Sequence, residues 1–461
     1  MGTIVLLALV VVEIAMLIAS IKVRSNSQEW MRIRTAVSLG ETLVLALLMA
    51  LPVAGIAFDF RWMALLIVLA VRAIIALITF FARSKKASAS VPHPTSRMVL
   101  NVVGSIIVIA LAVVPALVFP TYEGLPTSGE YDVRASHAIM VDTSSTDPFE
   151  QDGSYREVPV WFYYPDVSDA EAQRFPLVIF SHGAFGFHES NYSLYTELAS
   201  HGYVVAALEH PYHSLFSTDT EGKTILVDSD FINQVMGANS TDTSEAENFA
   251  FEQEWMQVRL SDLDFALDTI EAAAQTGSVD GEAWYFDSAE ERGSVLEALQ
   301  LANVEKVGLI GHSLGGAASV SEGRLRNEVG AVIDLDGTMI GEYLSYEDGK
   351  YTFVEDPYPV PLLSIDNEEH HLASLEAREQ GYSYVNNVVL DNADVSANTY
   401  FEGSGHMNFT DLPLFSPMLA SMLGTGDIDA RTCIEQTDAL VLAWFDEYLK
   451  GSGHATVAES Y

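Results

Sequence analysis

The first 120 residues contain four long apolar stretches separated by short polar segments. The stretches run over Thr3–Ile21, Val37–Phe58, Trp62–Phe81 and Met98–Phe119. Each is about 20 residues long, which is enough for a helix to cross a hydrocarbon core of about 30 Å. A cleavable signal peptide would explain only the first stretch, and that stretch lacks a basic start. We therefore predict a four-helix transmembrane domain over residues 1–120.

A different pattern begins after Thr121, where short apolar runs alternate with stretches of helical periodicity. We expect strands at 158–164, 176–180, 203–208, 306–310, 331–336, 361–366 and 399–403. We expect helices at 192–200, 252–274, 316–326 and 434–450. Runs that are apolar on both faces and are separated by helices indicate a mostly parallel sheet covered by helices on both sides. The pattern therefore predicts an α/β domain.

These two patterns place the domain boundaries. Residues 121–155 are expected to form a linker and lead-in segment, and residues 156–461 the α/β domain. Two polar insertions near 217–251 and 277–303 are too long for plain connections between a strand and a helix. We expect these insertions to form a cap over a site.

Basic residues are concentrated in two of the three loops that join the apolar stretches, whereas the loop between the second and third has only Asp59 and Arg61. The first of the two basic loops carries Lys22, Arg24, Arg32 and Arg34, and the second carries Arg83, Lys85, Lys86 and Arg97. Loops with an excess of Lys and Arg stay on the cytoplasmic side. We therefore expect a multi-pass protein of the cell membrane, with its N-terminus and everything after the fourth span outside the cytoplasm.

Two charges inside the apolar stretches, Glu13 and Arg72, have no obvious reason to be there. An isolated charge at the membrane centre costs about 2.5–3.5 kcal/mol on insertion scales, so such residues usually face the bundle and pair. If Glu13 pairs with Arg72, the first and third spans touch. The alternative is that each side chain reaches toward the interface or that Glu13 is protonated.

The second part of the chain is strongly acidic. It has 13 Lys and Arg against 59 Asp and Glu, whereas the first 120 residues have ten against four. A net charge of −46 repels nucleic acid, so we expect no nucleic-acid partner. Cys433 is the single cysteine, which excludes an intrachain disulfide. No motif requires a metal or a cofactor.

The run "KVGLIGHSLGGAASV" places a serine between a strand and a helix. The strand ends at Ile310, the chain turns through small residues around Ser313, and a helix of small residues follows. This strand-turn-helix setting of G-x-S-x-G is that of a nucleophile elbow, which lifts the serine Oγ out of the sheet. Ser313 is therefore the candidate nucleophile.

A nucleophilic serine needs a histidine as base and an acid that orients the histidine. In chains with a nucleophile elbow the acid follows the serine in the sequence, and the histidine follows the acid. His406 is the candidate base because it follows the last strand on a glycine-flanked loop, "EGSGHMNF". Asp334, Asp336 and Asp366 end strands and are the acid candidates, of which Asp336 is favoured, Asp366 is the alternative and Asp334 comes last. We interpret His370 and His371 as solvated.

Backbone N–H groups must stabilise the oxyanion that forms when the serine attacks. One donor is expected from Leu314, directly after the nucleophile. The second is expected from the strand-end loop "SHGAFG", where Ala184 is the first candidate and Phe185 the alternative. The other interpretation of this loop is an ordinary turn in which His182 has a structural role.

Several segments together resemble the platelet-activating factor acetylhydrolase family (type II and plasma type). They are "PLVIFSHGAFG", "LASHGYVVAALEHPYHS", "GHSLGGAA", "VIDLDG", "GSGHMNFTDLP" and "GDIDA", within about Glu157 to Lys450. The resemblance implies an α/β-hydrolase fold that releases short or oxidised acyl chains from phospholipids without calcium. It also implies Asp336 as the acid, His406 as the base, and Leu314 and Ala184 as oxyanion donors. Leu314 stands where familiar members have phenylalanine.

The sequence thus predicts a membrane-tethered serine esterase or lipase, a carboxylic ester hydrolase. Its substrates would be short or modified acyl esters, in particular those of phospholipids, and its four spans would bind the lipid bilayer. The linker at 121–130 reaches at most roughly 35 Å, which keeps the site near the bilayer. Alternatives are a polyester or small-ester hydrolase and a cell-surface acyltransferase, whose first half-reaction is the same. A non-enzymatic receptor is disfavoured because a full set of triad candidates is present.

Overall fold

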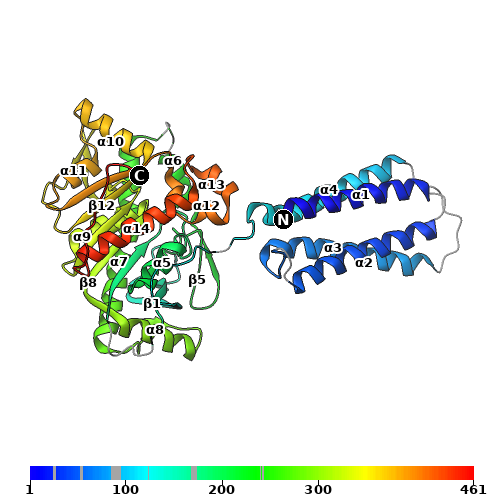
Figure 1. Cartoon of the computed structure of the whole chain (residues 1–461), viewed down its shortest axis with the longest axis horizontal. Helices are drawn as coiled ribbons and strands as arrows, with labels where there is room; N and C mark the ends of the chain where they lie inside the picture. The colour runs from blue at the N-terminus through cyan, green and yellow to red at the C-terminus, as the bar shows by residue number, and fades with distance from the viewer. Residues whose placement is uncertain are drawn as a thin grey trace. The chain divides into compact units, whose positions relative to one another are not determined.

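A computed structural model describes residues 1–23, 27–51, 55–84, 95–122, 124–167, 174–238, 240 and 243–461. The chain divides into two compact units (Figure 1). Unit 1 comprises residues 1–123 and Leu414–Leu419, and unit 2 comprises Gly124–Pro413 and Ala420–Tyr461. Of the basic loop residues used above to orient the spans, Arg24, Lys85 and Lys86 lie outside the described residues.

Unit 1 contains four long helices, which run over α1 (Gly2–Lys22), α2 (Ser27–Ala50), α3 (Phe60–Ser84) and α4 (Thr95–Val118). All four are long and apolar enough to cross a membrane. The second begins before the predicted Val37 and ends before the predicted Phe58. A proline at position 52 explains the early end, because the residue before a proline disfavours the helical conformation. The prediction of four apolar helices is confirmed, with this correction to the second.

The helices of unit 1 enclose a small apolar core, in which α1 packs on α4 and α2 on α3 (Figure 1). Arg72 on α3 forms an ion pair with Glu13 on α1, whose side chain is buried. Of the two alternatives that the sequence left open, the structure has the pairing of Glu13 with Arg72. A second carboxylate, that of Glu41 on α2, lies 4.0 Å from the same guanidinium. Three helices therefore contribute to one charged cluster that the sequence predicted only in part.

This cluster predicts that the loss of stability differs according to which of its charges is removed. We expect Arg72→Gln to destabilise the protein in detergent more than Glu13→Gln, because it leaves two carboxylates without their cation. The double variant should show a coupling of roughly 1–3 kcal/mol in a double-mutant cycle of thermal unfolding. Glu41→Gln is the control with the longer contact and should cost less. Strictly additive losses for Glu13 and Arg72 would contradict a direct interaction.

Unit 2 is built on a nine-stranded sheet with the order β13-β12-β9-β8-β3-β4-β2-β1-β7. Its strands run over β1 (Val133–Thr146), β2 (Tyr155–Pro165), β3 (Phe175–Ser181), β4 (Val204–Leu208), β7 (Trp284–Tyr285), β8 (Ala302–His312), β9 (Val329–Leu335), β12 (Leu362–Asn367) and β13 (Ser396–Phe401). Pairing is parallel from β13 to β4 and antiparallel from β4 to β7. All seven predicted strands are present in a mostly parallel sheet.

Helices cover both faces of this sheet (Figure 1). The main helices are α5 (Tyr192–Ser200), α7 (Glu245–Thr276), α8 (Ala289–Leu301), α9 (Leu314–Leu325) and α14 (Ala430–Tyr448). Along β3 the side chains alternate between two cores: Leu177 and Ile179 join the core of α7, α8 and α9, whereas Val178 and Phe180 join that of α5 and α14. Because successive side chains of a strand point to opposite faces, a run apolar at every position is buried on both sides.

The remaining elements are shorter. They are β5 (Phe216–Thr218), β6 (Thr224–Leu226), α6 (Ser229–Ala238), β10 (Tyr343–Glu347), β11 (Lys350–Phe353), α10 (Glu368–Gln380), α11 (Val385–Asp391), α12 (Leu412–Phe415), α13 (Pro417–Leu423), and the 3-10 turns at Ile340–Glu342 and His406–Phe409. The first polar insertion contains β5, β6, α6 and the start of α7, and the second contains β7 and α8. The lead-in segment is not all linker, since β1 pairs along its length with β2.

Candidate active site

Ser313 lies at a sharp turn between β8 and α9. Its backbone has φ 55° and ψ −123°, a conformation that costs energy for a residue with a side chain and that clusters at functional sites. The flanking glycines are needed for space: a Cβ on Gly311 would lie 2.2 Å from the Gly315 carbonyl carbon, and a Cβ on Gly315 would lie 1.9 Å from the Ser181 oxygen. The two glycines of G-x-S-x-G therefore permit the tight elbow, because a side chain at 311 would clash with Gly315 and a side chain at 315 would clash with the end of β3.

The loop that carries His406 lies against this elbow. Buried His312, the residue before Ser313, donates from Nε2 to the His406 carbonyl oxygen at 3.0 Å, and the two imidazole centroids are 4.6 Å apart. Burial lowers the pKa of His312 to about 3, so this ring is neutral. Among the described residues, no hydrogen bond joins Ser313 Oγ to the His406 ring.

Asp336 follows β9 and is buried, with a left-handed backbone (φ 57°) that aims its carboxylate at two histidines. Oδ2 accepts from His406 Nδ1 at 2.6 Å and from Asn367 Nδ2 at 2.6 Å. Oδ1 accepts from Asn367 N at 2.7 Å and from His370 Nδ1 at 2.9 Å. Four donors thus satisfy a buried carboxylate, which fixes the tautomer of His406 with its proton on Nδ1.

Burial alone would raise the pKa of Asp336, but the hydrogen bonds from His370 and His406 and the charge of these rings lower it below its usual range. The carboxylate therefore stays ionised at any pH at which the enzyme would work. Because the pKa in the folded protein is below that in the unfolded chain, Asp336 stabilises the fold above about pH 4 and loses this effect as the pH falls further.

Within the described part of the chain, the other two acid candidates accept no hydrogen bond from a histidine. Asp366 accepts from Ser364 Oγ at 2.9 Å and from Asn398 Nδ2 at 2.8 Å. Asp334 accepts from Gly337 N at 3.0 Å and lies beside Gly316 of α9. Burial raises the pKa of both carboxyls. Of the three candidates, only Asp336 is hydrogen-bonded to His406.

The interpretation of His370 and His371 as solvated is wrong. Asn367 caps α10 by accepting from His370 N at 2.9 Å, and this first turn brings the His370 ring to Asp336. The hydrogen bond to Asp336 raises the pKa of His370, against the effect of burial. His371 is buried and stacks on Tyr400, with ring centroids 4.2 Å apart. The sequence signal was the capping asparagine, which the run "SIDNEEHH" contains.

The position of His370 beside Asp336 predicts that its removal shifts the pH dependence of kcat/KM. While protonated, its ring places a cation 6.0 Å from the His406 ring centroid. We expect His370→Gln to move the acid limb of kcat/KM to higher pH by roughly half a unit, the size expected for charges this far apart near water. His371→Gln, which does not touch Asp336, is the control for pH profiles of ester hydrolysis. An unchanged acid limb in His370→Gln would argue against coupling.

Asp336, His370 and His406 also have donor atoms within 4.8 Å of one another, the distance range of a shared metal ion. Each imidazole Nδ1 instead faces a carboxylate oxygen at hydrogen-bond distance. The protons on these two Nδ1 atoms already satisfy the Asp336 carboxylate. A metal here would have to displace the proton that orients His406, so the donor set fits proton chemistry better than metal binding.

The loop after β3 carries the two candidates for the second oxyanion donor. Phe185 N donates to the His213 carbonyl oxygen at 3.0 Å, which leaves Ala184 as the candidate with an available N–H. A Cβ on Gly183 would lie 3.1 Å from Ser313 Cβ, so this loop lies directly over the nucleophile turn. His182 is buried and donates from Nδ1 to the Gly183 oxygen at 2.7 Å. Its Nε2 lies 2.8 Å from Ser214 Oγ, so both ring nitrogens have partners within the protein, and burial lowers its pKa well below the usual value.

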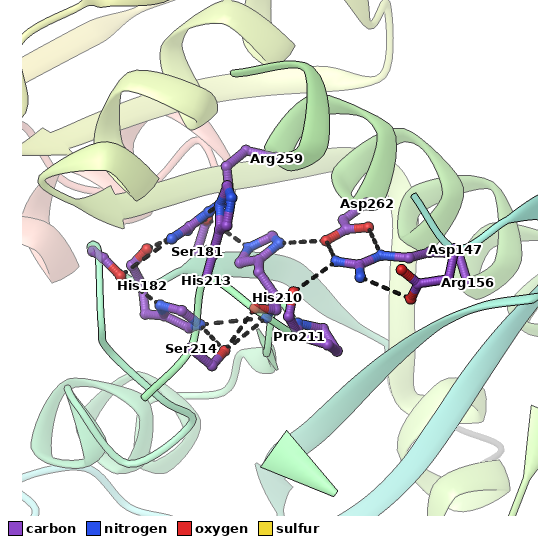
Figure 2. A network of polar contacts seen from close by, with 11 residues as sticks. Asp147, Arg156, Ser181, His182, His210, Pro211, His213, Ser214, Arg259 and Asp262 are labelled. Carbon is purple, nitrogen blue, oxygen red and sulfur yellow. Dashed lines mark hydrogen bonds and ion pairs between the residues drawn. The ribbon is translucent and has the colours of Figure 1, made fainter. Parts of the chain in front are cut away.

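A buried polar network lies beneath this loop (Figure 2). Arg156 donates to Asp262 at 2.8 and 2.9 Å, and Asp262 also accepts from His210 Nδ1 at 2.9 Å. The other ring nitrogen of His210 is 2.9 Å from Ser181 Oγ, at the end of β3. Burial lowers the pKa of His210 to about 4, so its ring is neutral and Nε2 accepts from the serine. Sequence reasoning identified none of these residues.

Known proteins are similar to this chain over much of unit 2. The family model described as platelet-activating factor acetylhydrolase, isoform II, matches residues 166–455. Curated platelet-activating factor acetylhydrolases are similar at 26% identity over 289 residues in Bos taurus and 25% over 289 residues in Canis lupus familiaris. Each alignment covers 60% of this chain and 58% of the relative. The chain thus matches little more than half of the length of these relatives.

A solved structure, the ferulic acid esterase from Streptomyces cinnamoneus, is similar with a TM-score of 0.51 and 20% identity. The match covers 72% of this chain and 94% of the esterase. At this identity the likeness concerns the fold alone. It confirms the predicted α/β-hydrolase fold for the part of the chain that follows the four apolar helices.

Proposed function

The chain belongs to the platelet-activating factor acetylhydrolase isoform II family, and we propose that it is a membrane-tethered serine esterase or lipase. Its substrates are short or modified acyl esters of phospholipids. The observation that carries the proposal is the 2.6 Å hydrogen bond from His406 to buried Asp336, next to the strained backbone of Ser313. These three residues follow different strands of one sheet, which is the arrangement of a catalytic triad in an α/β-hydrolase.

In the proposed reaction, Ser313 Oγ attacks the ester carbonyl while His406 Nε2 takes its proton. His406 then returns a proton to the leaving alcohol, and Asp336 holds the ring in the required tautomer. Water, activated by the same histidine, releases the acyl group from Ser313. The oxyanion is stabilised by Leu314 N–H, in the first turn of α9, and by Ala184 N–H. Donors at a helix N-terminus favour the negative charge.

The phospholipid substrate is supported by the names of the curated relatives and by the apolar unit in the same chain. Its test is a series of phospholipids that differ in sn-2 acyl length, compared with aryl esters, a polyester film, and an added alcohol acceptor. We expect the short-chain phospholipids to give the highest kcat/KM. A preference for polyester would assign a polymer hydrolase, and transfer of the acyl group to the alcohol would assign a transferase.

The membrane location is supported by apolar side chains on the outside of the four helices. Ile4 and Leu7 on α1, Leu43 on α2 and Leu100 and Leu111 on α4 are all 60–70% exposed. Exposed apolar surface of this extent suits lipid tails and not water. We propose that α1 to α4 span the membrane and that the hydrolase unit is extracytoplasmic, since most of the basic residues lie between the first and second and between the third and fourth apolar stretches of the sequence.

This orientation predicts that protease added to intact cells digests the chain beyond Thr121. The measurement is the loss of a C-terminal tag on an immunoblot, with a cytoplasmic protein as the control for intact membranes. Digestion should not require lysis. Protection of the tag until the cells are lysed would place the hydrolase unit in the cytoplasm and invert the assignment.

A further inference from the structure

Arg259 on α7 is a fully buried cation beneath the loop that follows β3 (Figure 2). Among the described residues, no carboxylate oxygen lies within 4 Å of its guanidinium, unlike that of Arg156 in the same network. A buried charge without an ion-pair partner is costly and persists only when other groups compensate it. The acceptors that do so identify what Arg259 does.

The main hydrogen-bond acceptors of Arg259 are backbone carbonyls of the loop that follows β3. Arg259 Nη1 donates to the His182 oxygen and Nη2 donates to the Gly183 oxygen at 3.2 Å. Nη1 also lies 3.3 Å from Ser181 Oγ, and Nε donates to His213 Nδ1 at 3.2 Å. Burial, with the Arg259 charge, lowers the pKa of His213 to about 2, so the neutral ring accepts. One side chain thus holds every residue from 181 to 183.

The cation itself remains charged at neutral pH. Burial lowers the pKa of Arg259 to about 9, against the effect of the Asp262 charge one turn along α7. The hydrogen-bond chain of Ser181, His210 and Asp262 connects this carboxylate to the guanidinium. The network in Figure 2 therefore supplies partial charge compensation at a distance while leaving the guanidinium free to bind carbonyls.

The contact with the Gly183 oxygen fixes the direction of the Ala184 N–H. In a trans peptide the C=O and the N–H point in opposite directions, and the described part of the chain contains no cis peptide bond. The Gly183 oxygen is held by Arg259, by Gly186 N at 3.1 Å and by His182 Nδ1 at 2.7 Å. The N–H of the same peptide, that of Ala184, therefore points away from α7.

We propose that Arg259 is a positioning residue that orients the Gly183–Ala184 peptide for oxyanion binding. The inference rests on the proposed function, because it takes Ala184 N–H as an oxyanion donor. Arg259 holds the peptide before substrate arrives, and its charge polarises the carbonyl so that the N–H becomes a stronger donor. The effect falls on the transition state, since negative charge develops on the carbonyl oxygen only there.

The test compares Arg259→Gln and Arg259→Lys with the matched changes at Arg156, which is equally buried but binds Asp262, Asp147 and the Pro211 oxygen. Active sites are titrated with a fluorophosphonate, so that rates refer to folded enzyme, and kcat and KM are measured on a short aryl ester. We expect Arg259→Gln to lower kcat by about 10²-fold, the lower range for loss of one oxyanion donor, with KM nearly unchanged.

Arg259→Lys keeps the charge but cannot bind two carbonyls as a fork, so we expect a kcat loss of about tenfold. This variant also decides the test if Arg259→Gln does not fold. The Arg156 variants, which remove no contact to residues 181–183, should lower the unfolding temperature and should lower kcat per titrated site less than Arg259→Lys does.

Wild-type kcat in both Arg259 variants, or equal kcat losses at Arg156, would overturn the positioning role. If instead the wild-type protein fails to react with the fluorophosphonate, the proposed function itself is wrong. The two failures are therefore distinguishable.

Discussion

Ser313→Ala is expected to abolish both fluorophosphonate labelling and ester turnover, with a loss in kcat of about 10⁶-fold. The size follows from the mechanism, because no acyl-enzyme forms without the hydroxyl and the remaining hydrogen-bond donors cannot replace it. The fold should be retained, since alanine fits wherever serine does and the strain at φ 55° is imposed by the surrounding turn. The measurements are gel-based labelling and turnover of a short-chain aryl ester.

Ser319→Ala is the matched control for this prediction. Ser319 lies on α9 close to the elbow, is buried, and donates to the Gly315 oxygen at 2.9 Å. Its loss should leave labelling and turnover near those of the wild type. Normal labelling of Ser313→Ala would mean that another residue is the nucleophile, and the assignment of the whole site would fail with it.

The central part of the fold was predictable because its signal is local. Strands such as β3 and β8 lie between two layers of helices, so they are apolar on both faces and stand out in the sequence. The strand β1 was missed because its outer half is exposed and ends in "DTSST". Helix α8 was missed because its buried positions, such as Val295 and Leu299, are sparse among charged residues.

The candidate site was predictable to the extent that it follows strand ends. Ser313, Asp336 and His406 each follow a strand of the parallel sheet, whose carboxyl ends meet at one edge. The place of His370 depends on a helix cap at Asn367, and a cap shows where a helix starts but not which carboxylate its first turn will face. The role of Arg259 could not be predicted from the sequence, because its acceptors are backbone carbonyls that only the folded chain brings to α7.

The choice among the acid candidates gives the second large prediction. Asp336→Asn is expected to lower kcat by about 10³- to 10⁴-fold, as loss of the orienting carboxylate does in serine hydrolases. The amide cannot accept from all four donors that now surround Asp336, and its NH₂ group would favour the wrong tautomer of His406. Backbone strain does not contribute, because asparagine tolerates the left-handed conformation that Asp336 adopts.

Asp366→Asn serves as the comparison, because this carboxyl is also buried at the end of a strand. Its partners are Ser364 and Asn398, and neither belongs to the proposed reaction. We expect a lower unfolding temperature but a kcat within a few fold of the wild type, measured per fluorophosphonate-titrated site. If Asp366→Asn were the variant that lost kcat, Asp366 would have to reach His406 during turnover. The hydrogen bonds that Asp336 makes in the resting enzyme would then hold the histidine in a non-reacting position.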